Sequence, residues 1–109
     1  MIKTMDNIEL VASFNLHPGT SEQFRSLMKT CIEQVRKNET GNLRYDWYHN
    51  EDGTVYKVVE TYANADAVMA HMQNVGQYLA QFMDITDFSG EVFGNLPKEL
   101  VAAFAGMDI

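Results

Sequence analysis

The strongest constraint on the fold is the order in which two hydrophobic periodicities follow one another along the chain. Residues 8–17 alternate apolar and polar side chains with a period of two, as in a half-buried strand. Pro18 and Gly19 break this pattern. Residues 22–38 then place apolar side chains at spacings of three and four, which form one stripe of an amphipathic helix. The first two elements are therefore a strand and a helix.

The same two patterns recur in the second half of the chain. Residues 43–50 and 54–62 alternate as two strands, joined by a turn in which Gly53 is free to take a positive φ. Asn64 can cap a second helix, which carries His71 at the margin of its apolar stripe. The stripe itself consists of Ala65, Val68, Met72 and Val75.

The remaining elements complete a recognisable order. We expect Gly76 to interrupt the second helix, with a further helical turn or two over residues 78–83. Residues 88–93 form a short final strand, and Pro97 opens a C-terminal helix because proline suits the first helical position. The order β-α-β-β-α-β with a C-terminal helix predicts a single α+β domain over residues 1–109, with ferredoxin-like architecture.

One face of the predicted sheet is expected to be an association surface. Only two long helices are available to cover a four-stranded antiparallel sheet, so the second face stays bare. We place Trp47, several tyrosines and several valines on both faces of the strands. A bare face of this kind marks association or ligand binding. We therefore expect a homodimer in which the two sheets cover one another.

Composition and charge exclude several classes of partner. The chain has 15 Asp+Glu against 8 Lys+Arg, a net charge of −7, which repels nucleic-acid phosphates and anionic membrane surfaces. Cys31 is the only cysteine, so neither an internal disulfide nor a thiolate metal cage can form, and we expect it to be an inert core thiol. The sequence has neither a signal-peptide pattern nor an apolar run of about 18 residues. We expect a cytoplasmic protein without nucleic-acid or membrane partners.

Four segments, taken in order, make the chain resemble a known family. They are Pro18-Gly19 before the first helix, residues 39–45 (ETGNLRY) before the second strand, residues 60–62 (ETY) at the end of the third strand, and residues 66–71 (DAVMAH) on the second helix. With these segments the chain resembles the antibiotic biosynthesis monooxygenase superfamily from residue 8 to about residue 97. The resemblance implies a dimeric α/β barrel and assigns His71 as the histidine of the family's second helix.

The resemblance implies more than one reaction. Members of the superfamily oxidise phenolic or quinol substrates without metal or flavin, degrade haem, or isomerise an autoinducer. The haem-degrading branch carries a tryptophan near its helix histidine, whereas the helix that bears His71 has no tryptophan. The isomerase branch has a basic residue where Met72 stands. We expect a small cofactor-independent monooxygenase acting on a phenolic, quinol or enolic molecule. The alternatives are an isomerase of a small hydroxy-ketone, of the autoinducer-degrading type, and a non-catalytic module that binds a small organic molecule.

His71 is the candidate catalytic base. A neutral imidazole with a pKa of about 6.5 can accept a phenol or enol proton near neutral pH. At the margin of the helix, His71 would be neither fully buried nor fully solvated, with one nitrogen directed at a pocket and the other bonded to Glu60 or a tyrosine hydroxyl. Glu60 interrupts an apolar strand, where it can orient His71 or pair with Arg44 at a dimer contact. We favour the contact with Arg44.

Aromatic and polar strand residues are predicted to bind the substrate. Aromatic rings can stack on a flat organic molecule, and tyrosine hydroxyls or the Asn15 amide can hydrogen-bond its oxygens. His17 and His49 end strands and are expected to be solvated, and no pair of histidines has the spacing of metal ligands. We therefore expect neither a metal nor another cofactor. The predicted substrate-binding residues are Asn15, Tyr45, Trp47, Tyr56, Glu60 and Tyr78.

Overall fold

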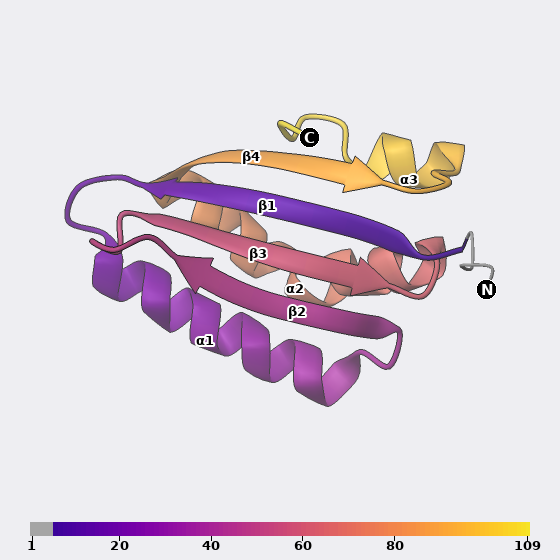
Figure 1. Ribbon diagram of the computed structural model, residues 1–109, viewed down its shortest axis with the longest axis horizontal. Helices are drawn as coiled ribbons and strands as arrows, with labels where there is room; N and C mark the ends of the chain where they lie inside the picture. The colour runs from indigo at the N-terminus through magenta and orange to yellow at the C-terminus, as the bar shows by residue number, and fades with distance from the viewer. Residues whose placement is uncertain (1–5) are drawn as a thin grey trace.

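Four strands form one antiparallel sheet in the order β2-β3-β1-β4, with β1 and β3 at its centre (Figure 1). The computed structural model describes residues 6–109. The elements are β1 (Ile8–Leu16), α1 (Ser21–Asn38), β2 (Asn42–His49), β3 (Val55–Tyr62), α2 (Ala65–Ile85), β4 (Thr86–Phe93) and α3 (Lys98–Ala103). This is the predicted ferredoxin-like α+β order with its additional C-terminal helix.

The core lies between the sheet and the pair of helices α1 and α2. Alternate residues of β1 point to this side and are buried, from Ile8 to Phe14. On α1 the buried residues are Phe24, Leu27, Cys31 and Val35. These spacings of three and four confirm the predicted helix face.

The aromatic side chains of the strands gather on the helix side of the sheet. Tyr45 is paired with Glu60, and Trp47 is paired with Val58, which is buried in the core. Most strand aromatics therefore lie on the covered face. Tyr48 and Phe93 are exposed on the other face, so the prediction that tyrosines and valines occupy both faces is confirmed only in part. The register explains the result, because paired residues point to the same face and Val58 fixes that face as the covered one.

The opposite face of the sheet is a mixture of apolar and polar side chains. Val11 and Val59 are register partners at its centre and are only partly buried. Their neighbours on the same face are Glu9, Ser13, Lys57, Thr61, Ser89 and Glu91. The face that we expect to associate is thus more polar than the sequence pattern indicated.

Helix α2 is continuous, so the expected break at Gly76 does not occur. The helix runs from Ala65 to Ile85, and Asn64 caps it by accepting a hydrogen bond from the backbone N–H of Ala67 at 2.9 Å. A glycine inside a helix costs about 1 kcal/mol relative to alanine. Val68, Val75 and Phe82, at intervals of seven residues, are at most 1% exposed. Burial of each such side chain contributes about 1.5–3 kcal/mol, which outweighs the cost of the glycine.

The C-terminal segment, residues 104–109, folds back over the sheet edge and the core. Phe104 is buried, and the backbone N–H of Gly90 in β4 donates to the carbonyl oxygen of Asp108 at 2.7 Å. Gly90 lacks a side chain, which leaves room for the side chain of Ile109. Among residues 6–109, no helix has the length and hydropathy of a membrane span.

Candidate active site

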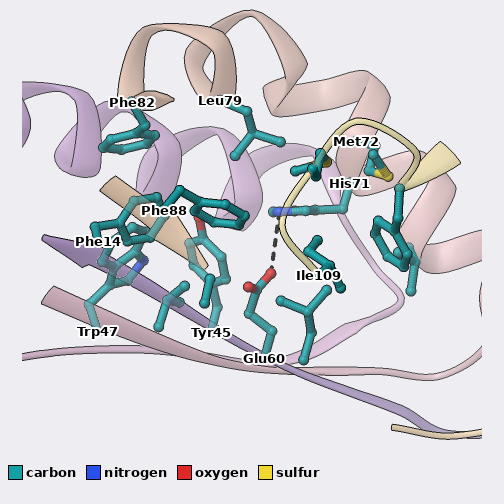
Figure 2. Close-up of a pocket in the computed structure, with 16 residues that line it drawn as sticks. Phe14, Tyr45, Trp47, Glu60, His71, Met72, Leu79, Phe82, Phe88 and Ile109 are labelled. Carbon is teal, nitrogen blue, oxygen red and sulfur yellow. Dashed lines mark ion pairs between the residues drawn. The ribbon is translucent and has the colours of Figure 1, made fainter. Parts of the chain in front are cut away.

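A small cavity lies between the sheet, helix α2 and the C-terminal segment (Figure 2). Its volume is about 40 Å³, which is room for a few water-sized molecules. Most of its lining is apolar. The polar side chains that reach it are Tyr45, Trp47, Glu60 and His71. The cavity therefore combines an apolar lining with one acid–base cluster.

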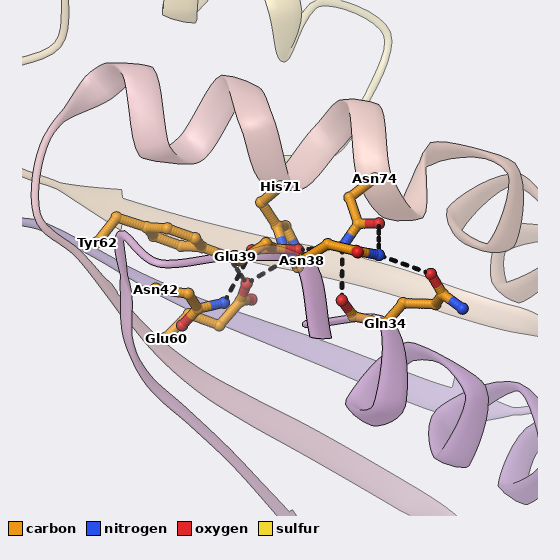
Figure 3. Close-up of polar contacts among 8 residues, drawn as sticks. All are labelled: Gln34, Asn38, Glu39, Asn42, Glu60, Tyr62, His71 and Asn74. Carbon is orange, nitrogen blue, oxygen red and sulfur yellow. Dashed lines mark hydrogen bonds and ion pairs between the residues drawn. The ribbon is translucent and has the colours of Figure 1, made fainter. Parts of the chain in front are cut away.

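His71 is held by a carboxylate on the loop that follows α1. Its Nδ1 lies 2.9 Å from Glu39 Oε1 and 3.0 Å from Glu39 Oε2 (Figure 3). Because an ionised carboxylate can only accept, this contact assigns a proton to Nδ1. His71 is 6% exposed, so the prediction of a half-buried residue at the helix margin was wrong. The rings of Tyr45 and Tyr62 pack against the imidazole and account for its burial.

Glu39 is the centre of a hydrogen-bond network that joins both helices to β2. Besides His71, it accepts from the Asn74 side chain at 2.7 Å and from the Asn42 side chain at 3.1 Å. Burial alone would raise the pKa of Glu39, but the hydrogen bonds from these three donors and the charge on His71 lower it below its usual range. Glu39 is therefore ionised at neutral pH, and its negative charge lies 2.9 Å from His71 Nδ1.

Glu60 faces the other nitrogen of the imidazole from strand β3. Its Oε1 lies 3.4 Å from His71 Nε2 and accepts a hydrogen bond from the Tyr62 hydroxyl. Burial raises the pKa of Glu60, and neither His71 nor Tyr62 offsets this effect in full. Burial and the nearby Glu60 also raise the pKa of Tyr62, so the phenol keeps its proton and donates it. Glu39 and Glu60 therefore lie on either side of one imidazole. The pKa of Glu39 is lowered and the pKa of Glu60 is raised.

Glu60 and Arg44 do not pair within one chain, and the favoured contact between them across a dimer stays a prediction. Glu60 points to the helix side of the sheet, whereas Arg44 is exposed and bonds Asp46 Oδ2 at 2.7 Å. The reason is the period of two along β2, because Tyr45, the register partner of Glu60, takes the covered face and sends Arg44 to the other.

Trp47 brings an unused hydrogen-bond donor to the cavity. Its Nε1 is buried and has no hydrogen bond of ordinary geometry within residues 6–109, although the Tyr45 hydroxyl lies near enough to interact with it. A buried donor without a partner is unfavourable by about 1–3 kcal/mol. The indole N–H is therefore a point at which an acceptor atom of a bound molecule would be stabilised.

Comparison with known proteins decides the family. The sequence model for antibiotic biosynthesis monooxygenases matches residues 7–83. The chain belongs to the antibiotic biosynthesis monooxygenase family. Among curated proteins, none matches this member of the family.

Several solved structures share the fold of this family member. MupZ from Pseudomonas fluorescens has a TM-score of 0.72 and 24% identity, over 93% of this chain and 80% of MupZ. Rv0793 from Mycobacterium tuberculosis has a TM-score of 0.73 and 24% identity, over 84% of this chain and 97% of Rv0793. A "putative antibiotic biosynthesis monooxygenase" from Caulobacter crescentus has a TM-score of 0.73 and 23% identity, over 85% of this chain and 92% of that chain. At these sequence identities, the similarity to the three structures shows a shared fold alone.

The structure of this family member brings four of the seven candidate site residues together. His71, Tyr45, Trp47 and Glu60 line the cavity. The other three do not line it: Tyr56 is buried against Phe24, Tyr78 is half-buried on α2, and Asn15 is exposed at the end of β1. At the surface, His17 contacts Asp87 and His49 contacts the Asn50 carbonyl oxygen.

Sequence reasoning missed the residues that hold the histidine. Glu39 is 32 residues from His71, and no local pattern connects the two. Asn74 offered a signal, because it lies three residues after His71 and shares its helix face. Tyr62 also offered one, because it follows Glu60 by two residues in a strand and points to the same side.

In the described part of the chain, no group of three or more His, Cys, Asp or Glu is arranged to hold a metal ion. Cys31 is fully buried, and burial, with smaller contributions from Glu39 and Glu60, raises its pKa to about 12. Its sulfur is therefore a thiol rather than a metal-binding thiolate.

Proposed function

We propose that this protein is a cofactor-independent monooxygenase that oxidises a small phenolic, quinol or enolic molecule, with His71 accepting the substrate proton. The proposal rests mainly on one observation, the buried imidazole whose Nδ1 is held by Glu39 and whose Nε2 faces Glu60 at 3.4 Å. Membership of the antibiotic biosynthesis monooxygenase family supplies the class of reaction.

The hydrogen-bond pattern gives His71 the electronic state that a base needs. With the proton on Nδ1, the Nε2 lone pair is directed toward the cavity. When Nε2 takes a proton, the resulting imidazolium lies 2.9 Å from the ionised Glu39. The opposite charge stabilises the protonated base within an apolar pocket.

The proposed reaction balances with O₂ as the only co-reactant. A phenol loses its O–H proton to the base, and the electron-rich anion transfers electrons to O₂ and forms a C–O bond at a ring carbon that bears hydrogen. That carbon then loses its hydrogen as a proton while the O–O bond breaks. One oxygen atom stays as a quinone carbonyl, and the other leaves as water with the two protons. Four electrons pass from the substrate to O₂.

The lining of the cavity supports a flat substrate with at least one acceptor oxygen. The rings of Phe14, Phe88 and Trp47 border the space and suit an aromatic molecule. The unpartnered Trp47 N–H suits a carbonyl or phenolate oxygen. A cavity of about 40 Å³ is too small for such a molecule, so a substrate would have to widen it.

A second function, isomerisation of a small hydroxy-ketone, has one specific observation in its favour. Burial raises the pKa of Glu60, which sets an acid beside the base His71. An acid and a base side by side can move a proton between two atoms of one substrate without O₂.

Oxygen uptake with a panel of naphthols, quinols and hydroxy-ketones separates these functions. We expect one O₂ consumed for each quinone formed, and a loss of turnover of about 10²-fold or more in His71→Gln. His49→Gln is the matched control at an exposed histidine and should keep the wild-type rate. Carbonyl migration without O₂ uptake would instead establish the isomerase, and binding without turnover would establish a non-catalytic module.

A further inference from the structure

The two oxygens of the Glu60 carboxyl group have different surroundings. Within residues 6–109, both the hydrogen bond from Tyr62 and the contact with His71 Nε2 are made by Oε1. Figure 2 shows the other oxygen pointing into the cavity, on the side of Tyr45. Glu60 therefore has one oxygen for its protein partners and one oxygen for an occupant of the cavity.

His71 is correspondingly enclosed by the protein on both sides. Glu39 Oε1 accepts a hydrogen bond from Nδ1 at 2.9 Å, and Glu60 Oε1 lies 3.4 Å from Nε2. A molecule in the cavity can thus contact the Glu60 Oε2 as well as the imidazole, because both residues line the space. A second acid–base group therefore lies beside the candidate base at the edge of the space for a substrate.

We propose that Glu60 is a catalytic residue, which contacts the substrate hydroxyl through Oε2 and passes a proton to His71 through Oε1. This inference rests on the proposed function, because it concerns the same cavity and the same proton. It replaces direct contact between the imidazole and the substrate by a relay of two groups.

Each step of the relay transfers one proton, and no electrons are transferred. The substrate O–H bond breaks and an O–H bond forms at Glu60 Oε2, while the proton formerly held by the carboxyl forms an N–H bond at His71 Nε2. The substrate becomes an anion, and the positive charge appears on His71 beside the ionised Glu39. When the oxygenated product releases water, the same pair returns the proton.

The groups around Glu60 suit this exchange. His71 and Tyr62 contact the carboxyl directly, and Glu39 acts on it through its negative charge. Tyr45 reaches the same cavity as a neutral phenol, because burial raises its pKa. Tyr62 is fully buried and fixes Oε1, which leaves Oε2 directed at the cavity.

The inference is tested with 1-naphthol under argon, where binding and proton transfer can be observed without oxygenation. We expect the wild-type protein to bind part of the naphthol as naphtholate, detected by its absorbance and fluorescence. Glu60→Gln should bind only the neutral form. Glu33→Gln, at an exposed glutamate on α1, is the matched control and should behave as wild type. Thermal unfolding and circular dichroism confirm that each variant is folded.

Air is then admitted to separate the two proposals. Naphtholate formation without O₂ uptake would refute the monooxygenase and leave the role of Glu60 standing. A loss of kcat/KM of about 10²-fold or more in Glu60→Gln supports the relay. Glu60→Asp, which keeps a carboxyl group, should retain part of the rate. Wild-type kcat/KM and wild-type naphtholate formation in a folded Glu60→Gln would overturn the inference.

Discussion

Glu39 and His71 are 32 residues apart in the sequence, and their side chains meet at 2.9 Å in the folded protein. This contact ties the end of α1 to the middle of α2 and fixes one nitrogen of the candidate base. The same carboxylate collects hydrogen bonds from Asn42 and Asn74, which anchors the loop between α1 and β2. One buried charge thus serves both the stability of the fold and the state of the imidazole.

Glu39→Gln is expected to destabilise the protein at pH 7 by about 1.5–3 kcal/mol, the range for hydrogen bonds to a charged group. The folded-state pKa of Glu39 lies below its usual value of 4.5. Its stabilising effect is therefore present above that value and is lost as the pH falls through the folded-state pKa. Thermal unfolding at pH 7 and pH 3 measures the difference. Glu33→Gln, at an exposed position of α1, is the control. An effect of equal size at both pH values would contradict this prediction.

Cys31→Ala should fold normally, retain activity and lose about 1 kcal/mol of stability through lost packing. Cys31→Asp should unfold the protein or weaken it severely, because it buries an unpaired charge in the α1 stripe. Both expectations follow from a side chain with no exposed surface. Since burial raises the thiol pKa to about 12, a bulky thiol reagent should label the native protein slowly. Rapid labelling of the native protein would show that this face of α1 opens to solvent.

We predict a homodimer that buries about 2,000 Å² or more in total through the open sheet face. Val59→Glu places a charge at the centre of that face, beside Val11, and should shift the mass measured by light scattering toward the monomer. Val101→Glu makes the same substitution at an exposed valine of α3 and should leave the dimer intact. A monomeric wild-type mass at micromolar concentration would refute the prediction.

The purified protein should be colourless, and its activity should survive treatment with a chelator. The reason is chemical, since the residues described offer no group of three ligands for a metal ion. Absorbance spectra and elemental analysis provide the measurement. A flavin or Soret band that persists through purification, or stoichiometric metal, would disprove the expectation.

Much of the fold could be predicted because strand and helix periodicities are local properties of the sequence. The first strand and first helix were placed to within one residue of β1 and α1. The break at Gly76 was wrong because the burial of Val75 and Phe82 overrides a local helix penalty. The final strand begins two residues earlier than expected, at Thr86, since α2 passes into β4 without a loop.

The site was only partly predictable, because its geometry depends on contacts between distant segments. His71 and Glu60 were found from residue type and position, and Tyr45 and Trp47 from their place on a strand. Glu39 carries no local signal of its partner, so the anchor of the base was missed. The sequence also carries no signal that residues 104–109 close the cavity, because this depends on how the chain folds back beside β4.

Side chains of the C-terminal segment border the cavity and compete with any bound molecule for the space. Phe104, Met107 and Ile109 place their side chains in the lining of a space of about 40 Å³. Because they are attached to the chain, their effective concentration at the cavity does not fall on dilution. If a larger molecule enters by displacing them, its observed affinity is its intrinsic affinity reduced by the fraction of protein in which they have moved away. The affinity of the pocket for a substrate therefore depends as much on the contacts that break as on those that form.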